Sequence, residues 1–396
     1  MWMKKNLLDY NLKNMRVIIR CDLNVPIENG VILDDTRIRE SIETIDFIVN
    51  RGAKVIILSH LGRVKEESDK VSKSLKPVSQ RLSELMNKEV KFIPFTRGAE
   101  VNNAVSLMQP KDIIMLENTR FEDLNGNLES NNNVELAKYW ASLGDIFIND
   151  AFGTMHRAHA SNVGIASFIP SGIGFLVKKE LDSINSVLNK TEKPFTIILG
   201  GAKVSDKIGI IKNAVNIADH VIISGGMAFT FYKALGYNVG LSIIDESSLD
   251  FCKNIYETYN NKIVLPDDIL AASSMYESAS TRLTDIKFIG QNEIGVDIGI
   301  SSLNKFKKII NESNTIIWNG PMGVFEIPKF SNGTRKLVEF LNNCSAKLIV
   351  GGGDTINALN KFDFNNRKVH ISTGGGALLA MLEGKDLPGL VSISDK

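Results

Sequence analysis

The chain has 396 residues, of which 43% are hydrophobic and 23% charged, as is typical of a globular protein with two or three domains. Its formal net charge of +1 argues against partners such as nucleic acids or membrane surfaces, since either normally requires a strong basic excess. Three widely spaced cysteines fit reduced thiols better than a disulfide framework, and no apolar run has signal-segment or membrane-spanning character. We therefore expect a cytoplasmic protein.

Short apolar runs alternate with longer amphipathic segments along the whole chain. Because the apolarity of these runs is continuous, they are expected to be strands buried on both faces, in parallel sheets with helical crossovers. The expected strands are Val17–Cys21, Lys54–Ser59, Val90–Ile93, Asp112–Leu116, Asp145–Asn149, Phe195–Leu199, His220–Ser224, Lys262–Leu265, Thr315–Trp318, Lys347–Val350 and Lys368–Ser372.

Turn-forming residues at Ile169–Gly174 interrupt this pattern and predict a domain boundary. We expect an α/β fold of two Rossmann-like, three-layer α/β/α domains with mainly parallel sheets. The first domain is predicted to cover residues 1–172 and the second residues 191–382. Residues 173–190, which have one apolar helical face, are predicted to form the helix and hinge that join them.

Cationic residues follow the expected strands of the first half, which contains ten of the thirteen arginines. Ligands of open α/β sheets bind at the carboxyl ends of the strands. Arginine binds carboxylate and phosphate groups bidentately, so this clustering predicts a receptor for a small polyanion. The strand-end cations are Arg20, Arg63, Arg120 and Arg157, with Arg37 in a following loop and His60 or His156 beside two of them.

Glycines follow the expected strands of the second half. Gly200 and Gly201 come directly after Phe195–Leu199 and precede two lysines, Lys203 and Lys207, one helical turn apart. Backbone N–H groups and ammonium charges converging in this way predict a phosphate cradle, although neither GxxxxGK[ST] nor GxGxxG is present.

Two further residues of the second half have a predicted ligand. Asp354 follows three glycines and is a natural Mg²⁺ ligand, because this ion prefers one or two carboxylates with phosphate oxygens and water. Glu326 is placed to accept hydrogen bonds from a ribose. A zinc site at His156 and His159 is disfavoured because no cysteine or carboxylate completes it, and His159 is expected to be structural.

Nine ordered segments, which span nearly the whole chain, resemble the phosphoglycerate kinase family. They read RCDLNVP, DDTRI, SHLGR, LENTRF, NDAFGTMHRAHAS, GGAKVSDKI, WNGPMGVFE, GGGDT and STGGGA. Two positions depart from the family pattern, Val64 in place of proline and Met155 in place of a smaller residue, and these put loop shape in doubt.

The resemblance implies specific roles for residues of each half. The residues implied to bind 3-phosphoglycerate are Asp22, Asn24, Arg37, His60, Arg63, Arg120 and Arg157. Those implied to bind the nucleotide are Lys207, Asn319, Glu326, Gly352, Gly353, Asp354 and Thr355. Asp354 is implied to bind Mg²⁺, and Arg37, Lys203 and Gly375 are implied to be catalytic.

The implied activity is reversible phosphoryl transfer from 1,3-bisphosphoglycerate to Mg·ADP by a monomeric phosphotransferase with a carboxyl acceptor. Such a transfer needs positioning and charge neutralisation but no general base, and the two domains would close on each other. The resemblance also places the tail, residues 383–396, on the first domain. A nicotinamide-dependent dehydrogenase would need the missing dinucleotide fingerprint. The alternative is a non-catalytic, closure-type protein or scaffold that binds small anions.

Overall fold

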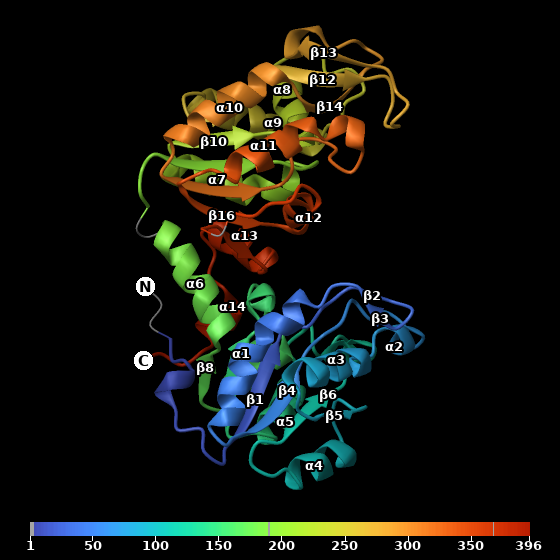
Figure 1. Ribbon diagram of the computed structural model, residues 1–396, viewed down its shortest axis with the longest axis vertical. Helices are drawn as coiled ribbons and strands as arrows, with labels where there is room; N and C mark the ends of the chain where they lie inside the picture. Colours follow the sequence, from blue (N-terminus) through green and yellow to red (C-terminus); the bar gives the residue numbers. More distant parts are fainter. Residues whose placement is uncertain (1–3, 189–190, 367) are drawn as a thin grey trace. The chain divides into compact units, whose positions relative to one another are not determined.

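The computed structural model describes residues 4–188, 191–366 and 368–396, and the chain divides into two compact units (Figure 1). The first unit comprises Met1–Asp182 and Asp386–Lys396, and the second comprises Ser183–Lys385. The chain therefore passes from one unit to the other twice.

The first unit is built around a six-stranded sheet in the order β5-β6-β4-β1-β7-β8, with all neighbouring strands parallel. Its strands are β1 (Arg16–Cys21), β4 (Lys54–Leu58), β5 (Val90–Ile93), β6 (Ile113–Leu116), β7 (Ile146–Asp150) and β8 (Ser171–Ile173). Successive residues of β1, such as Ile18 and Ile19, point to opposite faces and are both fully buried. The sheet is therefore covered on both sides.

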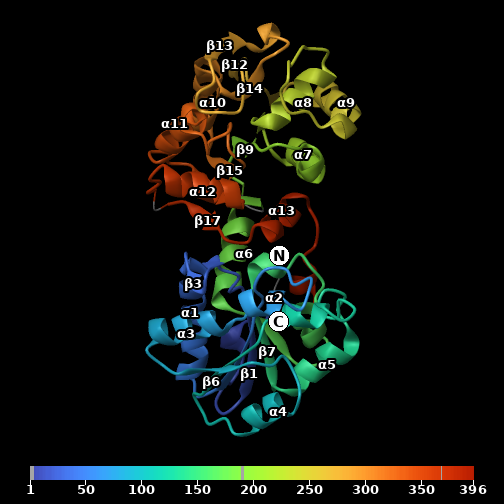
Figure 2. The same cartoon turned by 90° about the vertical axis from the view of Figure 1, so that its right-hand side faces the viewer.

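Helices flank this sheet in two layers. Figure 2 shows α1 (Thr36–Asn50) and α3 (Lys76–Met86) on one side of β1 and β7, and α5 (Val134–Ser142) on the other. The remaining elements are short and include a hairpin of β2 (Ile27–Glu28) and β3 (Val31–Ile32), α2 (Asp69–Ser72), α4 (Ala99–Ser106) and a π-helix at Ala160–Gly164.

The second unit repeats the plan with a parallel sheet in the order β11-β10-β9-β15-β16-β17. Its strands are β9 (Phe195–Leu199), β10 (His220–Ile223), β11 (Ile263–Val264), β15 (Thr315–Asn319), β16 (Lys347–Gly351) and β17 (His370–Ser372). The largest buried side chain of this sheet is Trp318, which packs in a cluster with Phe306 and Leu337.

The helices of the second unit also form two layers, as Figure 2 shows. One side carries α7 (Ile208–Ile217), α8 (Gly226–Ala234) and α9 (Leu249–Tyr259), and the other carries α10 (Ile300–Glu312), α11 (Asn332–Leu341) and α12 (Gly353–Lys361). The helix α6 (Phe175–Leu188) runs from the first unit into the second, and α13 (Gly376–Leu382) precedes the return of the chain.

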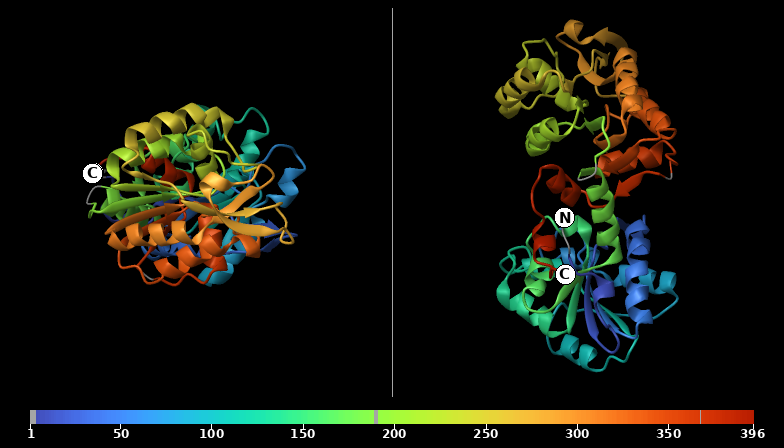
Figure 3. Two further views of the ribbon diagram at one scale, coloured as in Figure 1. Left: turned by 90° about the horizontal axis from the view of Figure 1, so that it is seen from above. Right: turned by 90° about the vertical axis from the view of Figure 1, so that its left-hand side faces the viewer.

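The last segment, Asp386–Lys396, docks on the first unit (Figure 3). In α14 (Pro388–Val391), Gly389 N donates a hydrogen bond to Met155 O at 2.9 Å. Lys4 Nζ donates to Ile393 O at 2.8 Å and lies 2.8 Å from Asp395 Oδ1. Met155, a departure from the family pattern, is fully buried beside this segment.

The predicted fold class is confirmed, and the eleven predicted strands match β1, β4 to β7, β9 to β11 and β15 to β17. Within the segment Ile169–Gly174, the sequence analysis missed the strand β8, in which Ser171–Ile173 pairs with β7. The sequence analysis also missed an antiparallel sheet, β13-β12-β14, formed by Thr281–Asp285, Asp268–Ala272 and Ile294–Ile298.

Most of the predicted joining helix is present as α6, while residues 189 and 190 lie outside the described residues. The two compact units are defined by contacts within the chain, whereas the predicted domains are defined by the ligands that they bind. The domain limits 1–172, 173–190 and 191–382 therefore stay predictions. Among the described residues, no helix is both long enough and apolar enough to cross a membrane.

Candidate functional site

The carboxyl ends of β1, β4, β6 and β7 gather the predicted cations of the first unit. Because neighbouring parallel strands end at one edge of the sheet, the residues that follow them come close together. Burial and the charges of Arg120 and Arg63 lower the pKa of Arg157, while Asp22 opposes this shift. Four predicted substrate-binding residues are thus within electrostatic reach of one another.

Asp22 and Asn24 organise two loops at this edge. The Arg37 guanidinium forms an ion pair with Asp22, whose side chain is almost fully buried. Asn24 Oδ1 accepts a hydrogen bond from Gly62 N at 2.8 Å, which fastens the loop after β4 to the loop after β1. These two side chains therefore hold Arg37 and Arg63 near the strand ends.

One nitrogen of the Arg120 side chain is hydrogen-bonded within the protein, and another has no partner in the described part of the chain. Its Nη1 donates to Asp123 Oδ2 at 2.9 Å and also to Ser130 Oγ. Within the described residues, however, its buried Nε and the buried Thr119 Oγ1 have no hydrogen-bond partner. A buried donor without a partner is costly, so a ligand oxygen that accepts a hydrogen bond from these atoms would bind favourably.

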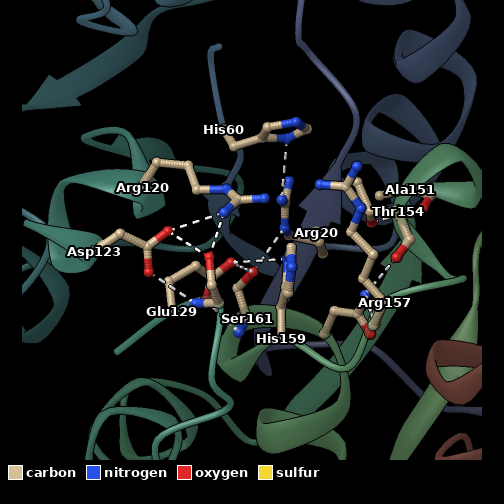
Figure 4. A network of polar contacts seen from close by, with 12 residues as sticks. Arg20, His60, Arg120, Asp123, Glu129, Ala151, Thr154, Arg157, His159 and Ser161 are labelled. Carbon is tan, nitrogen blue, oxygen red and sulfur yellow. Dashed lines mark hydrogen bonds and ion pairs between the residues drawn. The ribbon is translucent and has the colours of Figure 1, made fainter. Parts of the chain in front are cut away.

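Arg20, a strand-end cation without a predicted role, is the most deeply buried arginine of the site (Figure 4). It donates from Nε to Ser161 Oγ at 2.9 Å and from Nη1 to Cys21 O at 2.5 Å, while its Nη2 lies 3.2 Å from His60 Nδ1. Ser161 in turn binds the carboxylate of Glu129, and its backbone N lies 2.9 Å from Glu129 Oε2. Sequence reasoning did not predict Glu129 or Ser161.

The imidazoles at this edge are poor bases. Loss of hydration and the nearby charges of Arg20 and Arg120 hold the pKa of His60 well below its usual range. Burial lowers the pKa of His159 to about 3, although Glu129 Oε1 lies 3.8 Å from its Nδ1. Both rings are therefore neutral near pH 7, and the positive charge of the site comes from its arginines.

The carboxyl edge of the second sheet is formed by backbone. Gly320 has a φ of +103°, and a Cβ atom there would lie 2.3 Å from Gly200 O. A Cβ atom on Gly200 would lie 2.0 Å from Pro321 O. The loops after β9 and β15 can approach this closely only because neither position carries a side chain.

Three predicted nucleotide-binding side chains hold these loops together. Lys207 Nζ donates to Gly200 O at 2.6 Å and to Asn319 O at 3.0 Å. Asn319 Nδ2 donates to Gly351 O at 2.7 Å, and Thr355 Oγ1 accepts from Gly320 N at 2.7 Å. Burial lowers the pKa of Lys207 to about 8, and the charge of Asp354 opposes this shift.

A cavity of about 460 Å³ opens beside these loops, and both Glu326 and Asp354 line it. Its wall is otherwise mainly apolar and includes Phe229, Ile243 and Met322. Gly352, with a φ of +96°, and Gly353 begin α12, which carries Asp354 in its first turn. The residues described as lining the cavity do not include Lys203, which is exposed, or Gly375, which precedes α13.

Comparisons with known proteins identify relatives that span almost the whole chain. The family model for phosphoglycerate kinase matches residues 7–385. The phosphoglycerate kinase of Enterococcus faecalis is 49% identical over 395 residues, covering 99% of this chain and 100% of that protein. That of Listeria innocua is 48% identical over 394 residues, with the same coverage.

Solved structures show the same likeness. The structure of phosphoglycerate kinase from Coxiella burnetii superposes with a TM-score of 0.88 at 39% identity, and that from Pyrococcus horikoshii with 0.84 at 29%. Each comparison covers 98% of both chains. With its family model, its relatives and its fold in agreement, the chain belongs to the phosphoglycerate kinase family.

Proposed function

We propose that the two units of this phosphotransferase each bind one substrate, phosphoglycerate on the first and the adenine nucleotide on the second. The reaction is the reversible transfer of a phosphoryl group from 1,3-bisphosphoglycerate to ADP, a step of glycolysis that yields 3-phosphoglycerate and ATP. The single observation that carries the division is the contrast between the arginine-rich edge of one sheet and the cavity beside the other.

The first unit offers what a small, multiply charged anion needs. Arg63, Arg120 and Arg157 supply guanidinium groups for its carboxylate and phosphate oxygens. His60, Asp22 and Asn24 supply neutral or acceptor groups for its remaining polar atoms. The partnerless Arg120 Nε supports this assignment, because a ligand oxygen would satisfy it.

The second unit offers a surface for each part of a nucleotide. The apolar wall of the cavity suits a base, and the exposed carboxylate of Glu326 suits the hydroxyls of a ribose. The glycine-lined loops and the N-terminus of α12 present backbone N–H groups to phosphates. Lys207, Asn319 and Thr355 act mainly by holding those loops in place.

The donor set fits Mg²⁺ brought in with the nucleotide. Among the described residues, no cluster of three histidine, cysteine or acidic side chains could hold a metal by itself. Asp354 is one exposed carboxylate beside the cavity, and Mg²⁺ is usually held by one or two carboxylates with phosphate oxygens and water. When bound, the ion would neutralise charge on the phosphate chain.

The chemistry requires charge neutralisation and no proton abstraction, because a carboxylate or phosphate oxygen already carries the attacking electron pair. Arg37 and Lys203 would stabilise the charge of the moving phosphoryl group, with the backbone at Gly375 beside it. Transfer also requires that the two substrates meet away from water, so we propose that the segment joining the units acts as a hinge. We further propose a cytoplasmic monomer.

Calorimetry on two matched variants tests the division of substrates. Arg157→Ala should weaken binding of 3-phosphoglycerate and leave Mg·ADP unaffected, while Glu326→Ala should do the reverse. ATP formation from 1,3-bisphosphoglycerate and ADP should fall in both variants relative to the wild type. If either variant lost affinity for both ligands equally while remaining folded, the assignment of one substrate to each unit would be wrong. The comparisons give no support to a non-catalytic anion-binding role.

A further inference from the structure

Arg20 is an unusual residue for the end of a buried strand. It is 1% exposed, yet its charged group is directed to three partners within the first unit: Ser161 Oγ, Cys21 O and His60 Nδ1 (Figure 4). Burying a charge is expensive unless it is fully hydrogen-bonded and compensated. The arrangement around Arg20 therefore needs a physical reason beyond packing.

The contact with His60 determines where the proton of that ring lies. A guanidinium has only donors, so the nitrogen 3.2 Å from Arg20 Nη2 must offer a lone pair. With Nδ1 unprotonated, the imidazole is neutral and carries its proton on Nε2. The charges of Arg20, Arg37 and Arg120 oppose a second proton on this ring.

The orientation of Arg20 is set by a second contact. Ser161 Oγ accepts from Arg20 Nε, so its own proton goes to the carboxylate of Glu129. Glu129 is fully buried and also accepts from Ser161 N at 2.9 Å. Glu129 thus supplies the compensating charge for Arg20 through one hydroxyl and fixes the plane of the guanidinium.

We propose that Glu129, Ser161 and Arg20 form a positioning chain that holds His60 as its neutral Nε2–H tautomer, so that a single N–H donor faces 3-phosphoglycerate. This rests on the proposed role of His60 as a substrate ligand. With Nδ1 occupied by Arg20, Nε2 is the ring nitrogen left for a ligand. The chain is a positioning device and not a set of catalytic residues, because it acts on the substrate through His60.

Nitrogen NMR of the histidine rings in the wild-type protein tests the chain directly. The protein has five histidines, so the His60 signals can be assigned by their loss in His60→Gln. We expect His60 to show a protonated Nε2 and an unprotonated Nδ1, unchanged from about pH 5.5 to about pH 8. A ring protonated at both nitrogens near pH 7, or at Nδ1 alone, would overturn the proposal.

Ser161→Ala cuts the chain while keeping both charged residues. In this variant we expect mixed tautomers of His60 and a KM for 3-phosphoglycerate raised about three- to tenfold, the cost of one hydrogen bond. The kcat and the KM for Mg·ADP should change less than about twofold. A purely structural role would instead lower thermal stability and leave the tautomer unchanged.

Ser130→Ala is the matched control, because Ser130 Oγ contacts the other buried arginine, Arg120. It should leave the His60 tautomer as in the wild type. Mixed His60 tautomers in both serine variants would show that the positioning chain through Ser161 does not specifically set the tautomer. His60→Ala, which removes the ring and its N–H donor, separates this inference from the proposed function. A normal KM for 3-phosphoglycerate in that variant would remove His60 from the substrate ligands, whereas the wild-type spectrum alone decides the tautomer.

Discussion

We propose that the two units use the same kind of sheet to bind anions by opposite means. Each sheet has six parallel strands, and in each the candidate site residues follow the carboxyl ends. In the first unit these ends carry long cationic side chains, whereas in the second they carry glycines whose backbones pack directly against one another. The fold fixes where a ligand binds, and the residues after each strand decide how it is held.

Repulsion between clustered cationic side chains is an electrostatic cost of the first unit. Burial, together with repulsion from Arg120 and Arg63, lowers the pKa of Arg157, and buried carboxylates such as Glu129 and Asp22 balance the clustered guanidinium groups. Backbone N–H groups carry no net charge and need no such balance. Recognition by cationic side chains thus requires buried carboxylates that compensate their charge, while recognition by the backbone requires glycines at the positions of close approach.

Removal of Arg37 should produce the largest effect in the first unit. Arg37→Ala is expected to raise the activation free energy by about 2–4 kcal/mol, or lower kcat roughly 30- to 1000-fold, because a donor to the moving group is lost. Arg39→Ala is the matched control, since Arg39 lies on the same helix and pairs with Asp35 at the surface. Steady-state kinetics with near-normal kcat in Arg37→Ala would refute the role.

The two lysines of the second unit should separate turnover from binding. Exposed Lys203 is proposed to act on the moving group, so Lys203→Met should lose turnover by about 2–4 kcal/mol and keep its affinity for Mg·ADP. Lys207 fastens the loops, so Lys207→Met should weaken that affinity about tenfold or more, by the loss of charged hydrogen bonds. If calorimetry showed equal losses of Mg·ADP affinity in both variants, the proposed separation of the two lysine roles would be wrong.

Substitution of two glycines tests whether the close approach of backbone segments is specific to the second unit. Gly320→Ala should destabilise that unit by about 3 kcal/mol and weaken Mg·ADP binding, because strain at φ +103° adds to the clash with Gly200 O. Gly126 in the first unit has a similar φ of +96°, but a Cβ there would meet nothing within 4 Å among the described residues. Gly126→Ala should therefore cost only about 1–2 kcal/mol. Equal losses of thermal stability would argue against the close approach.

The smallest predicted effect is that the stabilities of the two units change in opposite directions with pH. Burial raises the pKa of Asp297 to about 7, so its stabilising contribution is complete below about pH 4 and is lost as the pH rises through 7. The pKa of His159 is lowered to about 3, so its contribution is present above about pH 6.5 and is lost as the pH falls.

Unfolding by urea can measure the two responses separately, because Trp140 and Trp318 are fully buried in different units. Relative to Asp297→Asn, the wild-type second unit should lose about 1–2 kcal/mol between about pH 5 and pH 7. Relative to His159→Gln, the wild-type first unit should gain a similar amount over the same range. The same sign for both differences would show that these two groups do not set the pH response.

The parts of the fold that could be predicted from sequence are those with a continuous apolar pattern. The strands of both parallel sheets have this pattern, and their chemically unusual ends identified most of the candidate site residues. The strand β13 escaped prediction because its burial is irregular, with Leu283 and Arg282 both exposed on an edge. The three-residue strand β8 is too short, and too rich in turn formers, to be recognised.

The parts of the site that could not be predicted depend on long-range contacts. Arg20 and Ser161 are 141 residues apart, and no local pattern pairs them. Likewise, the sequence predicts that Lys207 and Asn319 lie near phosphates, but it cannot show that both donate to backbone carbonyls of neighbouring loops. Sequence patterns therefore predict the edges at which ligands bind, whereas the supporting hydrogen bonds needed the fold.

The pairing of Lys4 with Ile393 and Asp395 has a consequence for how the protein is made. The ribosome completes Ser183–Lys385 before it has made the segment Asp386–Lys396 that the first unit requires. The second unit, although later in the sequence, therefore has all its residues first. Met155 of the first unit, by contrast, has no α14 to contact until the last segment leaves the exit tunnel.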